Sequence, residues 1–289
     1  CTKSLAERAI SRSPHIVKMT GILAGLLAAY MGLVGALYVA QRHLMYHPGG
    51  PSLSPTAAGV PEMRTIELKT RDGLLVSSWY APPKSGQPTL VYFHGNAGAI
   101  VDRAEKARPY LHHGYGVLLA GYRGYGGNPG SPSEQGLYAD GEAVIEFLKT
   151  QGILPAAQIM YGESLGTGIA VEMAHRLAVS ATPVGAVVLE APFTSMPDAA
   201  AGHYPYVPAK LLVKDRYDSL AKISDIDAPL FIFHGDQDKV VPQKLGKQLF
   251  EAASEPKQVH WITSANHNNL YDFGGALEAI RFIDRWLRK

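Results

Sequence analysis

Short apolar runs alternate with longer amphipathic segments from about residue 63 to the C-terminus, and this alternation limits the fold more than any other feature of the chain. Runs that are almost entirely apolar are typical of strands that helices cover on both faces. Strands that alternate with helices predict a mostly parallel, doubly wound α/β sheet. The first two runs flank the turn Arg71-Asp72-Gly73, so we expect an antiparallel hairpin at one edge. The eight runs are RTIELKT, LLVSSWYAP, TLVYFHG, GVLLAGYRG, QIMYGES, AVVLEAP, PLFIFHG and QVHWITSANH.

A long apolar stretch precedes this domain. No charged residue occurs in the 22 residues from Met19 to Ala40. A helix of that length spans about 33 Å, enough to cross a hydrocarbon core of about 30 Å. We therefore predict a transmembrane helix at residues 19–40 and the lipid bilayer as a partner. A buried core helix and a cleaved signal peptide are the alternatives, although the stretch is longer than the usual apolar part of a signal peptide.

The charges around the stretch predict its orientation. Four Lys or Arg residues lie within residues 1–18, whereas Arg42 is the only one between the stretch and Arg64. The positive-inside rule then places residues 1–18 in the cytoplasm and the C-terminal domain outside it, in a periplasm or a lumen. Residues 41–62 are rich in Pro, Gly and Ser and are expected to link the helix to a catalytic domain at 63–289.

Small residues recur four positions apart within the apolar stretch. These are Gly21 and Gly25, and then Ala28, Gly32 and Ala36. Small residues at this spacing let two membrane helices approach closely. The pattern is therefore compatible with a homodimer formed through this face of the helix.

Composition excludes several classes of function. The net charge of +2 is too small for a nucleic-acid partner. Cys1 is the only cysteine, so neither an intramolecular disulfide nor a Cys/His zinc site is expected. The pair His112 and His113 has no second cluster at ligand spacing, so we predict no metal and no cofactor. The chain starts with Cys1 rather than Met, which we interpret as trimming or processing, with a lipid-modified cysteine as the alternative.

Residues 162–166, GESLG, fit the pattern G-x-S-x-G. They follow a predicted strand and open a predicted helix. A sharp strand-to-helix turn strains the serine backbone and raises its hydroxyl above the sheet. This context makes Ser164 the candidate nucleophile, and the backbone N–H of Leu165 one candidate donor to an oxyanion.

A serine hydroxyl needs a base and an orienting acid, which in this kind of site follow it in the order acid, then histidine. His267 comes at the end of the last predicted strand, and HGDQD offers Asp236 and Asp238 as acids. Active sites of open α/β sheets gather at the carboxyl ends of strands. We therefore predict a triad of Ser164, one of these aspartates and His267.

The motifs HGNAG, GYRGYGGNPGSPSEQGLYAD, GESLG, LEAPFTS, HGDQDKVVP and ANHNN occur in this order. Together they resemble the BEM46 branch of the α/β-hydrolase superfamily, which includes ABHD13-like and ABHD17-like membrane-anchored hydrolases. The resemblance runs from about Tyr46 to the C-terminus and implies an α/β-hydrolase fold. It also implies Asp238 as the acid, with Asp236 as a turn residue, and Asn96 as the second oxyanion donor, with Ala97 as the alternative.

Other residues have a structural or a pocket role in this interpretation. His94 and His234 each precede a glycine at a strand end and are expected to orient loops by hydrogen bonds. Tyr122, in the segment YRGYG, is expected in the pocket wall, with a tight structural turn as the alternative. Residues 196–226 are too few for a large lid, and their Tyr204 and Tyr206 are candidates for an acyl site or for contact with the bilayer. A small helix packed on the domain is the alternative.

The predicted activity is hydrolysis of an ester or thioester through an acyl-serine intermediate. A serine peptidase or amidase would use the same triad, and a binding protein that kept the scaffold without catalysis is a third reading. ABHD17-like relatives remove acyl chains from protein cysteines, which requires a cytosolic domain. Because the charges predict the opposite orientation, we expect a lipid or small acyl ester as the substrate.

Overall fold

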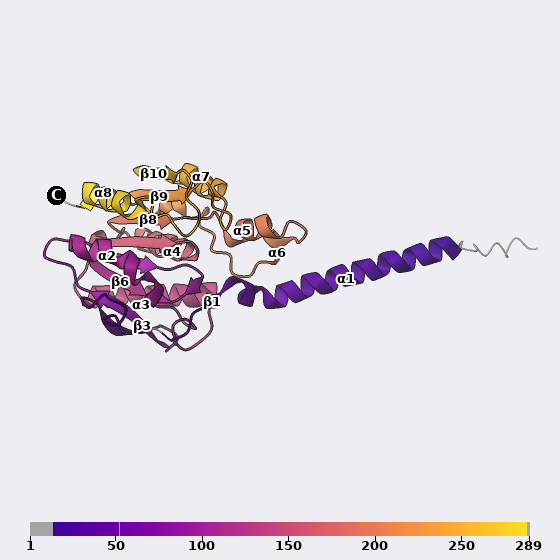
Figure 1. Ribbon diagram of the computed structural model, residues 1–289, viewed down its shortest axis with the longest axis horizontal. Helices are drawn as coiled ribbons and strands as arrows, with labels where there is room; N and C mark the ends of the chain where they lie inside the picture. Colours follow the sequence, from indigo (N-terminus) through magenta and orange to yellow (C-terminus); the bar gives the residue numbers. More distant parts are fainter. Residues whose placement is uncertain (1–13, 52, 288–289) are drawn as a thin grey trace, which may run out of the picture. The chain divides into compact units, whose positions relative to one another are not determined.

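The computed structural model describes residues 14–51 and 53–287 and divides into two compact units between Gln41 and Arg42. Helix α1 (Pro14–Met45) contains the predicted span and extends beyond it at both ends (Figure 1). From Lys18 onward it is long and apolar enough to cross a membrane. Its apolar side chains are exposed along its length, as Leu26 and Val39 illustrate. Such a helix is compatible with membrane anchoring, since lipid would cover these side chains.

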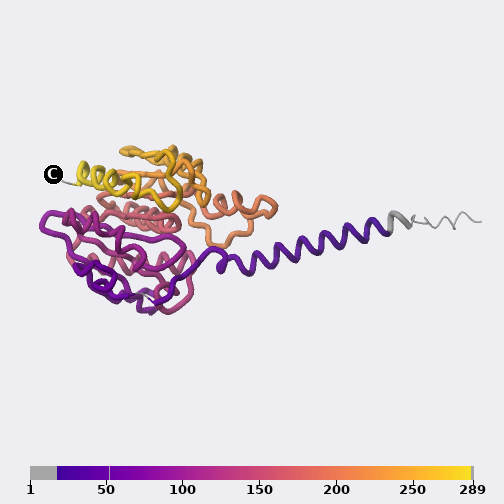
Figure 2. Tube along the Cα trace, viewed as in Figure 1, coloured from indigo at the N-terminus to yellow at the C-terminus, as the bar shows by residue number. Residues whose placement is uncertain are grey.

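The second unit contains a twisted α/β sheet that confirms the predicted fold class. In the described residues the sheet has eight strands in the order β10-β9-β8-β7-β4-β6-β3-β2. Strand β3 pairs antiparallel with β2 and with β6, and the other neighbours are parallel. In Figure 2 the colour accordingly changes across the sheet from purple to orange and yellow. The strands are β2 (Arg64–Lys69), β3 (Leu75–Ala81), β4 (Thr89–Phe93), β6 (Gly116–Ala120), β7 (Gln158–Glu163), β8 (Ala186–Glu190), β9 (Leu230–Gly235) and β10 (Lys257–Ile262).

The burial of each strand follows its place in the sheet. Every residue of β4, β6 and β8 is buried, as their uninterrupted apolar runs predict. In the edge strand β2, by contrast, only Ile66 and Leu68 are buried. Helices cover both faces and the resulting core has two apolar clusters, one with α3, α4 and α7 and the other with α2 and α8. The helices are α2 (Ala104–His113), α3 (Glu134–Thr150), α4 (Leu165–Val179), α5 (Met196–His203), α6 (Ala209–Leu212), α7 (Gln243–Ala252) and α8 (Gly275–Leu287), with 3-10 turns at Ile100–Arg103, Pro155–Ala157 and Ile223–Asp225.

The segment that composition predicts as a linker packs on the α/β unit, which begins at Arg42. Tyr46 and Val60 are buried in its two apolar clusters. Strand β1 (His47–Pro48) pairs in parallel with β5 (Ala97–Gly98), in the loop after β4. The Pro and Gly residues of this segment correctly predicted irregular backbone. Its buried apolar side chains, however, attach that backbone to the domain.

Residues 196–226 contain two short helices, α5 and α6, as expected for a small lid. Ala199, Ala209 and Tyr217 are buried, so part of the segment packs on the domain. Tyr206 and Leu211 are exposed, at 59% and 83%. The burial of Ala199, Ala209 and Tyr217 agrees with a small helical segment packed on the domain, and an acyl site or bilayer contact at Tyr204 and Tyr206 stays a prediction.

His94 lies at the end of β4 and is buried. Its ring stacks on that of Tyr122, with centroids 4.1 Å apart, and meets the ring of Tyr125 edge-on. Its Nδ1 lies 2.8 Å from the carbonyl oxygen of Gly95. Burial, and then the nearby Arg103 guanidinium, lower the pKa of His94 to about 3. His94 is therefore neutral in the folded protein at neutral pH, and it supports the loop as predicted.

The burial of the strands predicts that two leucine-to-alanine variants differ strongly in their free energy of unfolding. Leu118→Ala, at a fully buried position of β6, should lower the free energy of unfolding by about 2–5 kcal/mol, because it leaves a cavity. Leu154→Ala, at a position that is 71% exposed, should change it by less than about 0.5 kcal/mol. Denaturant unfolding of the full chain in detergent measures both. Similar losses for the two variants would contradict the strand assignment of β6.

The lowered pKa of His94 predicts a pH-dependent stability. Between about pH 6.5 and about pH 3 the unfolded chain binds a proton at this residue and the folded chain does not. The contribution of His94 to the free energy of unfolding therefore decreases by about 1.4 kcal/mol for each unit by which the pH is lowered in this range. His94→Phe should remove this contribution, whereas His112→Phe, at an exposed histidine, should keep it. Denaturant unfolding between about pH 7 and about pH 5 measures the slopes. An unchanged slope in His94→Phe would show that the folded protein binds this proton.

Candidate active site

Ser164 occupies the sharp turn between β7 and α4. Its φ of 50° and ψ of −116° are a strained conformation for a residue with a side chain. Its backbone N–H donates to the carbonyl oxygen of Glu190, at 2.9 Å, which fixes the turn to strand β8. Gly166 lies so close to the carbonyl oxygen of Phe93 that a Cβ there would overlap it. The first turn of α4 thus packs directly on the end of β4.

The three residues predicted as a triad lie in one chain of hydrogen bonds. His267 Nε2 is 3.0 Å from Ser164 Oγ, and His267 Nδ1 is 2.6 Å from Asp238 Oδ2. Because a carboxylate only accepts, the imidazole carries its proton on Nδ1 and offers the Nε2 lone pair to the serine hydroxyl. This arrangement can take a proton from Ser164 while holding the imidazole in one tautomer.

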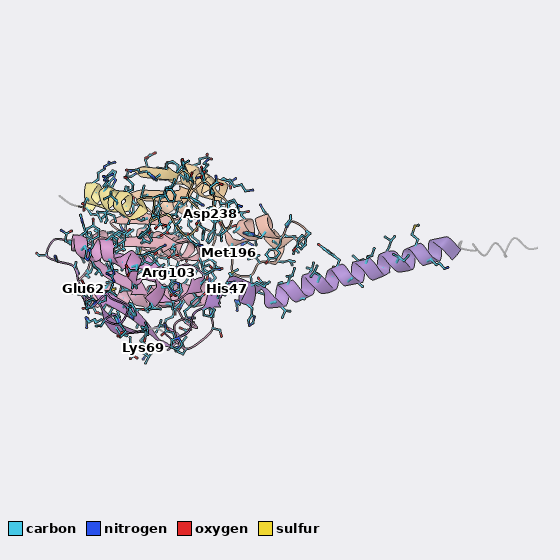
Figure 3. The ribbon with its side chains drawn as sticks, viewed as in Figure 1. His47, Glu62, Lys69, Arg103, Met196 and Asp238 are labelled. Carbon is cyan, nitrogen blue, oxygen red and sulfur yellow. The ribbon has the colours of Figure 1, made fainter. Side chains whose placement is uncertain are left out.

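Asp238, labelled in Figure 3, is held by several donors. The backbone N–H groups of Val240 and Val241 each donate to Oδ1 at 2.8 Å. The buried His234 lies beneath it, with Nε2 3.2 Å from Oδ2. Burial by itself would raise the pKa of Asp238, but the hydrogen bonds from His234 and His267 hold it well below its ordinary value. The carboxylate therefore stays ionised beside the imidazole.

Asp236, the other acid of this loop, lies elsewhere. Its Oδ1 accepts from the backbone N–H of Ser264 at 2.8 Å and connects the loops after β9 and β10. Asp238, rather than Asp236, is the carboxylate that contacts His267. Spacing in the sequence left the two open, and the resemblance to hydrolases distinguished them.

The loop after β4 lies beside Ser164. A Cβ on Gly95 would lie 3.6 Å from the Cβ of Ser164. Asn96 follows, and Leu165 is the first residue of α4. Two backbone N–H donors near a nucleophile are what an oxyanion requires, and the first turn of a helix leaves its N–H groups free for this purpose.

Several contacts fix the backbone of Asn96. Its side-chain amide donates to the carbonyl oxygen of Met45 at 2.9 Å. Its own carbonyl oxygen accepts from the N–H of His47 and from the hydroxyl of Tyr125, both at 2.9 Å. The segment just after the apolar helix therefore helps to hold the loop that carries Asn96.

A buried group of charges under the turn was missed at the sequence level. Arg103, labelled in Figure 3, makes two hydrogen bonds to Glu163, at 2.9 and 3.0 Å, and Tyr92 donates to the same carboxylate. Lys106 pairs with Glu190 at 2.7 Å. Burial would raise the pKa of Glu163, but Lys106 and Arg103 lower it. In the sequence, only Glu163 at the first variable position of G-x-S-x-G could have pointed to this group of charges. Its partners lie on other helices and strands, so the motif does not predict them.

The tyrosines predicted in the pocket have different surroundings. Tyr122 is fully buried and donates to the carbonyl oxygen of His94 at 3.0 Å, so its hydroxyl supports the loop after β4. Tyr204 and Tyr206 pack edge-on between α5 and α6, with ring centroids 6.4 Å apart. This ring contact joins the two tyrosines to each other and does not include His267 of the predicted triad.

No metal-binding cluster is found among the side chains that the structure describes. Among them no three or more His, Cys, Asp or Glu residues group so that they could hold a metal ion.

Comparisons with known proteins identify the family of the chain. The family described as alpha/beta hydrolase fold matches residues 88–219. An uncharacterized protein of Mycobacterium tuberculosis is 39% identical over 255 residues, which cover 86% of this chain and 89% of that protein. Protein bem46 of Schizosaccharomyces pombe is 30% identical over 271 residues, or 88% of each chain. The lysophosphatidylserine lipase ABHD12 of Danio rerio is 30% identical over 243 residues, covering 71% of this chain and 63% of that protein.

Solved structures show the same fold at lower identity. The esterase Pf2001 of Pyrococcus furiosus has a TM-score of 0.64 and 20% identity, over 84% of this chain and 98% of its own. An α/β hydrolase of Vibrio vulnificus has a TM-score of 0.66 and 20% identity, over 82% and 96%. With the identity to bem46 over most of both chains, these findings show that the chain belongs to the α/β-hydrolase family, in the group of relatives that contains bem46.

Proposed function

We propose that the chain is a membrane-anchored serine hydrolase that cleaves a carboxylic ester or thioester through an acyl-serine intermediate. The hydrogen-bonded series of Asp238, His267 and Ser164 is the observation that carries this proposal. Esterases and a lipase among the similar proteins support a hydrolase of acyl groups.

In the proposed mechanism His267 Nε2 takes the hydroxyl proton as Ser164 Oγ attacks the carbonyl carbon. The backbone N–H groups of Leu165 and Asn96 stabilise the negative oxygen of the tetrahedral intermediate. His267 then gives its proton to the departing alcohol or thiol, which leaves the acyl-serine. A water molecule, deprotonated by His267, releases the acid in the same way. Asp238 stabilises the imidazolium in both steps.

A lipid or small acyl ester is the proposed substrate class. The relative of Danio rerio is named a lysophosphatidylserine lipase, and its likeness supports an ester with an acyl chain. An apolar helix at residues 18–45 supports anchoring in a membrane, where such substrates reside. Pairing of two copies through the face of Gly21 and Gly25 stays a prediction.

Labelling with a fluorophosphonate tests the nucleophile. Wild type should react, and Ser164→Ala should lose both the label and at least about 10⁴-fold of its ester turnover, because Ser164 is the hydroxyl hydrogen-bonded to His267. Ser195→Ala, in which a helix-capping serine is replaced, is the matched control and should still be labelled. A folded wild-type chain that does not react would favour the scaffold without catalysis.

Turnover assays with the wild-type chain test the substrate class. Turnover of p-nitrophenyl acyl esters of increasing length is compared with that of aminoacyl anilides. Preference for the esters is expected. Selective cleavage of the anilides would instead make the chain a peptidase or amidase.

Two changes at Asn96 test its role as a backbone donor. Asn96→Pro removes the N–H and should lower kcat by about 10²–10³-fold. Asn96→Ala keeps the N–H and loses the side-chain bond to Met45, so it should cost no more than about tenfold. Thermal unfolding of both variants controls for damage to the loop. Equal losses in kcat from two equally stable variants would argue against a backbone donor.

The orientation is tested by reporters fused to the C-terminus. Alkaline phosphatase, which folds only outside the cytoplasm, should be active, and green fluorescent protein should not fluoresce after export. Replacing the four basic residues within 1–18 by serine should weaken this preference. A cytoplasmic reporter in the unchanged chain would overturn the orientation and favour a thioesterase that acts on acylated protein cysteines.

A further inference from the structure

A cavity of about 130 Å³ lies at the carboxyl edge of the sheet, apart from the predicted triad. Ser77 and Trp79 of β3 line it, together with His94 after β4 and Ile100 at the start of the 3-10 turn. Tyr125, from the loop after β6, also lines it. Among the described residues that line it, none belongs to the Ser164, Asp238 and His267 series.

His94, one of the residues that line this cavity, has an unused hydrogen-bond acceptor. Its Nδ1 must carry the proton, because the group 2.8 Å away is the carbonyl oxygen of Gly95, which only accepts. Nε2 is then a bare lone pair. It is buried and has no hydrogen-bond partner among the described residues. The ring is also fixed between Tyr122 and Tyr125, so the acceptor cannot turn elsewhere.

Tyr125 and Asn128, which also line the cavity, already make hydrogen bonds within the protein, and the lining carries no charged side chain among the described residues. The Tyr125 hydroxyl donates to the carbonyl oxygen of Asn96. The Asn128 amide exchanges hydrogen bonds with the backbone of Ser77. None of the described lining residues is Asp, Glu, Lys or Arg. An ion would therefore find no opposite charge in the wall, and a neutral His94 offers only a lone pair. The cavity selects a neutral molecule with a hydrogen-bond donor.

The volume and the apolar lining of the cavity further restrict the class of ligand. Cavities of about 150 Å³ in other proteins take up benzene, so a molecule of similar or slightly smaller size fits here. Trp79 and Ile100 provide apolar surface beside the acceptor. A small alcohol has both parts, an O–H donor and a short apolar body.

We propose that this cavity is a binding site for a small neutral alcohol, whose hydroxyl donates to His94 Nε2 while its carbon chain packs on Trp79 and Ile100. The site shares the loop after β4 with Asn96, on which the proposed function relies, but binding itself does not require hydrolysis. An occupant would contact His94 and Ala99, which lie two residues before and three residues after Asn96 in this loop. This is a second small-molecule site, distinct from the triad.

The probe is 2,2,2-trifluoroethanol, which has as many non-hydrogen atoms as benzene and is read by fluorine NMR with the full chain in detergent. A saturable change of its resonance is expected on wild type. His94→Leu, which removes the acceptor, should weaken the saturable component at least about tenfold, the effect of one lost hydrogen bond. His112→Leu, the same change at an exposed histidine, should bind like wild type.

Two more variants keep the test decisive. Thr65→Phe, at an exposed residue of β2 that lines the cavity, should block the site even where His94→Leu does not fold. Ser164→Ala should bind the probe unchanged, which separates this site from the proposed hydrolase function. The absence of a saturable component on folded wild type would mean that the cavity holds only water. Equal saturable binding by wild type, His94→Leu and Thr65→Phe would place the probe elsewhere and overturn the proposal.

Discussion

The close packing of helix α4 on the end of strand β4 is the constraint on which the rest of the site depends. Gly166 meets the carbonyl oxygen of Phe93 at a distance that no side chain would allow. This contact brings two different strand ends together, so that Ser164 and the loop of Gly95 become neighbours. The nucleophile and its proposed oxyanion donors are therefore set by backbone packing, which is stiffer than any single side-chain contact.

Charge under the turn reinforces this backbone contact. The side chains of Arg103 and Glu163 are only 14% and 15% exposed, so either charge would be costly without the other. Paired in two hydrogen bonds, they connect the residue before Ser164 to the 3-10 turn that follows the loop after β4. Ala99 and Asp102 bond within that turn, so the pair acts on the whole loop. The two elements that must be in register for catalysis thus share one ion pair.

Two buried histidines that precede a glycine, His94 after β4 and His234 within β9, show how context decides the use of a residue. His234 Nε2 lies 2.9 Å from the carbonyl oxygen of Val241 and 3.2 Å from the carboxylate that holds the catalytic imidazole in the proposed mechanism. His94 is neutral and lines a cavity, and its Nε2 has no partner among the described residues. Both were expected to orient loops, and both contact their loops. Their different hydrogen-bond partners, rather than their similar motifs, separate a positioning role from a binding role.

The sequence by itself determined the fold class and the candidates Ser164 and His267, and the resemblance to hydrolases chose Asp238 over Asp236 as the acid. Uninterrupted apolar runs predict buried strands because burial on both faces leaves no polar position, and the order of serine, acid and histidine follows successive strand ends. The tertiary structure alone decided what depends on residues far apart in the chain. It showed Tyr46 and Val60 packed on the domain, Arg103 against Glu163, and an unused acceptor at His94. Short sequence motifs do not predict such contacts, because residues that are tens of positions apart come together only when the strands pair in the folded sheet.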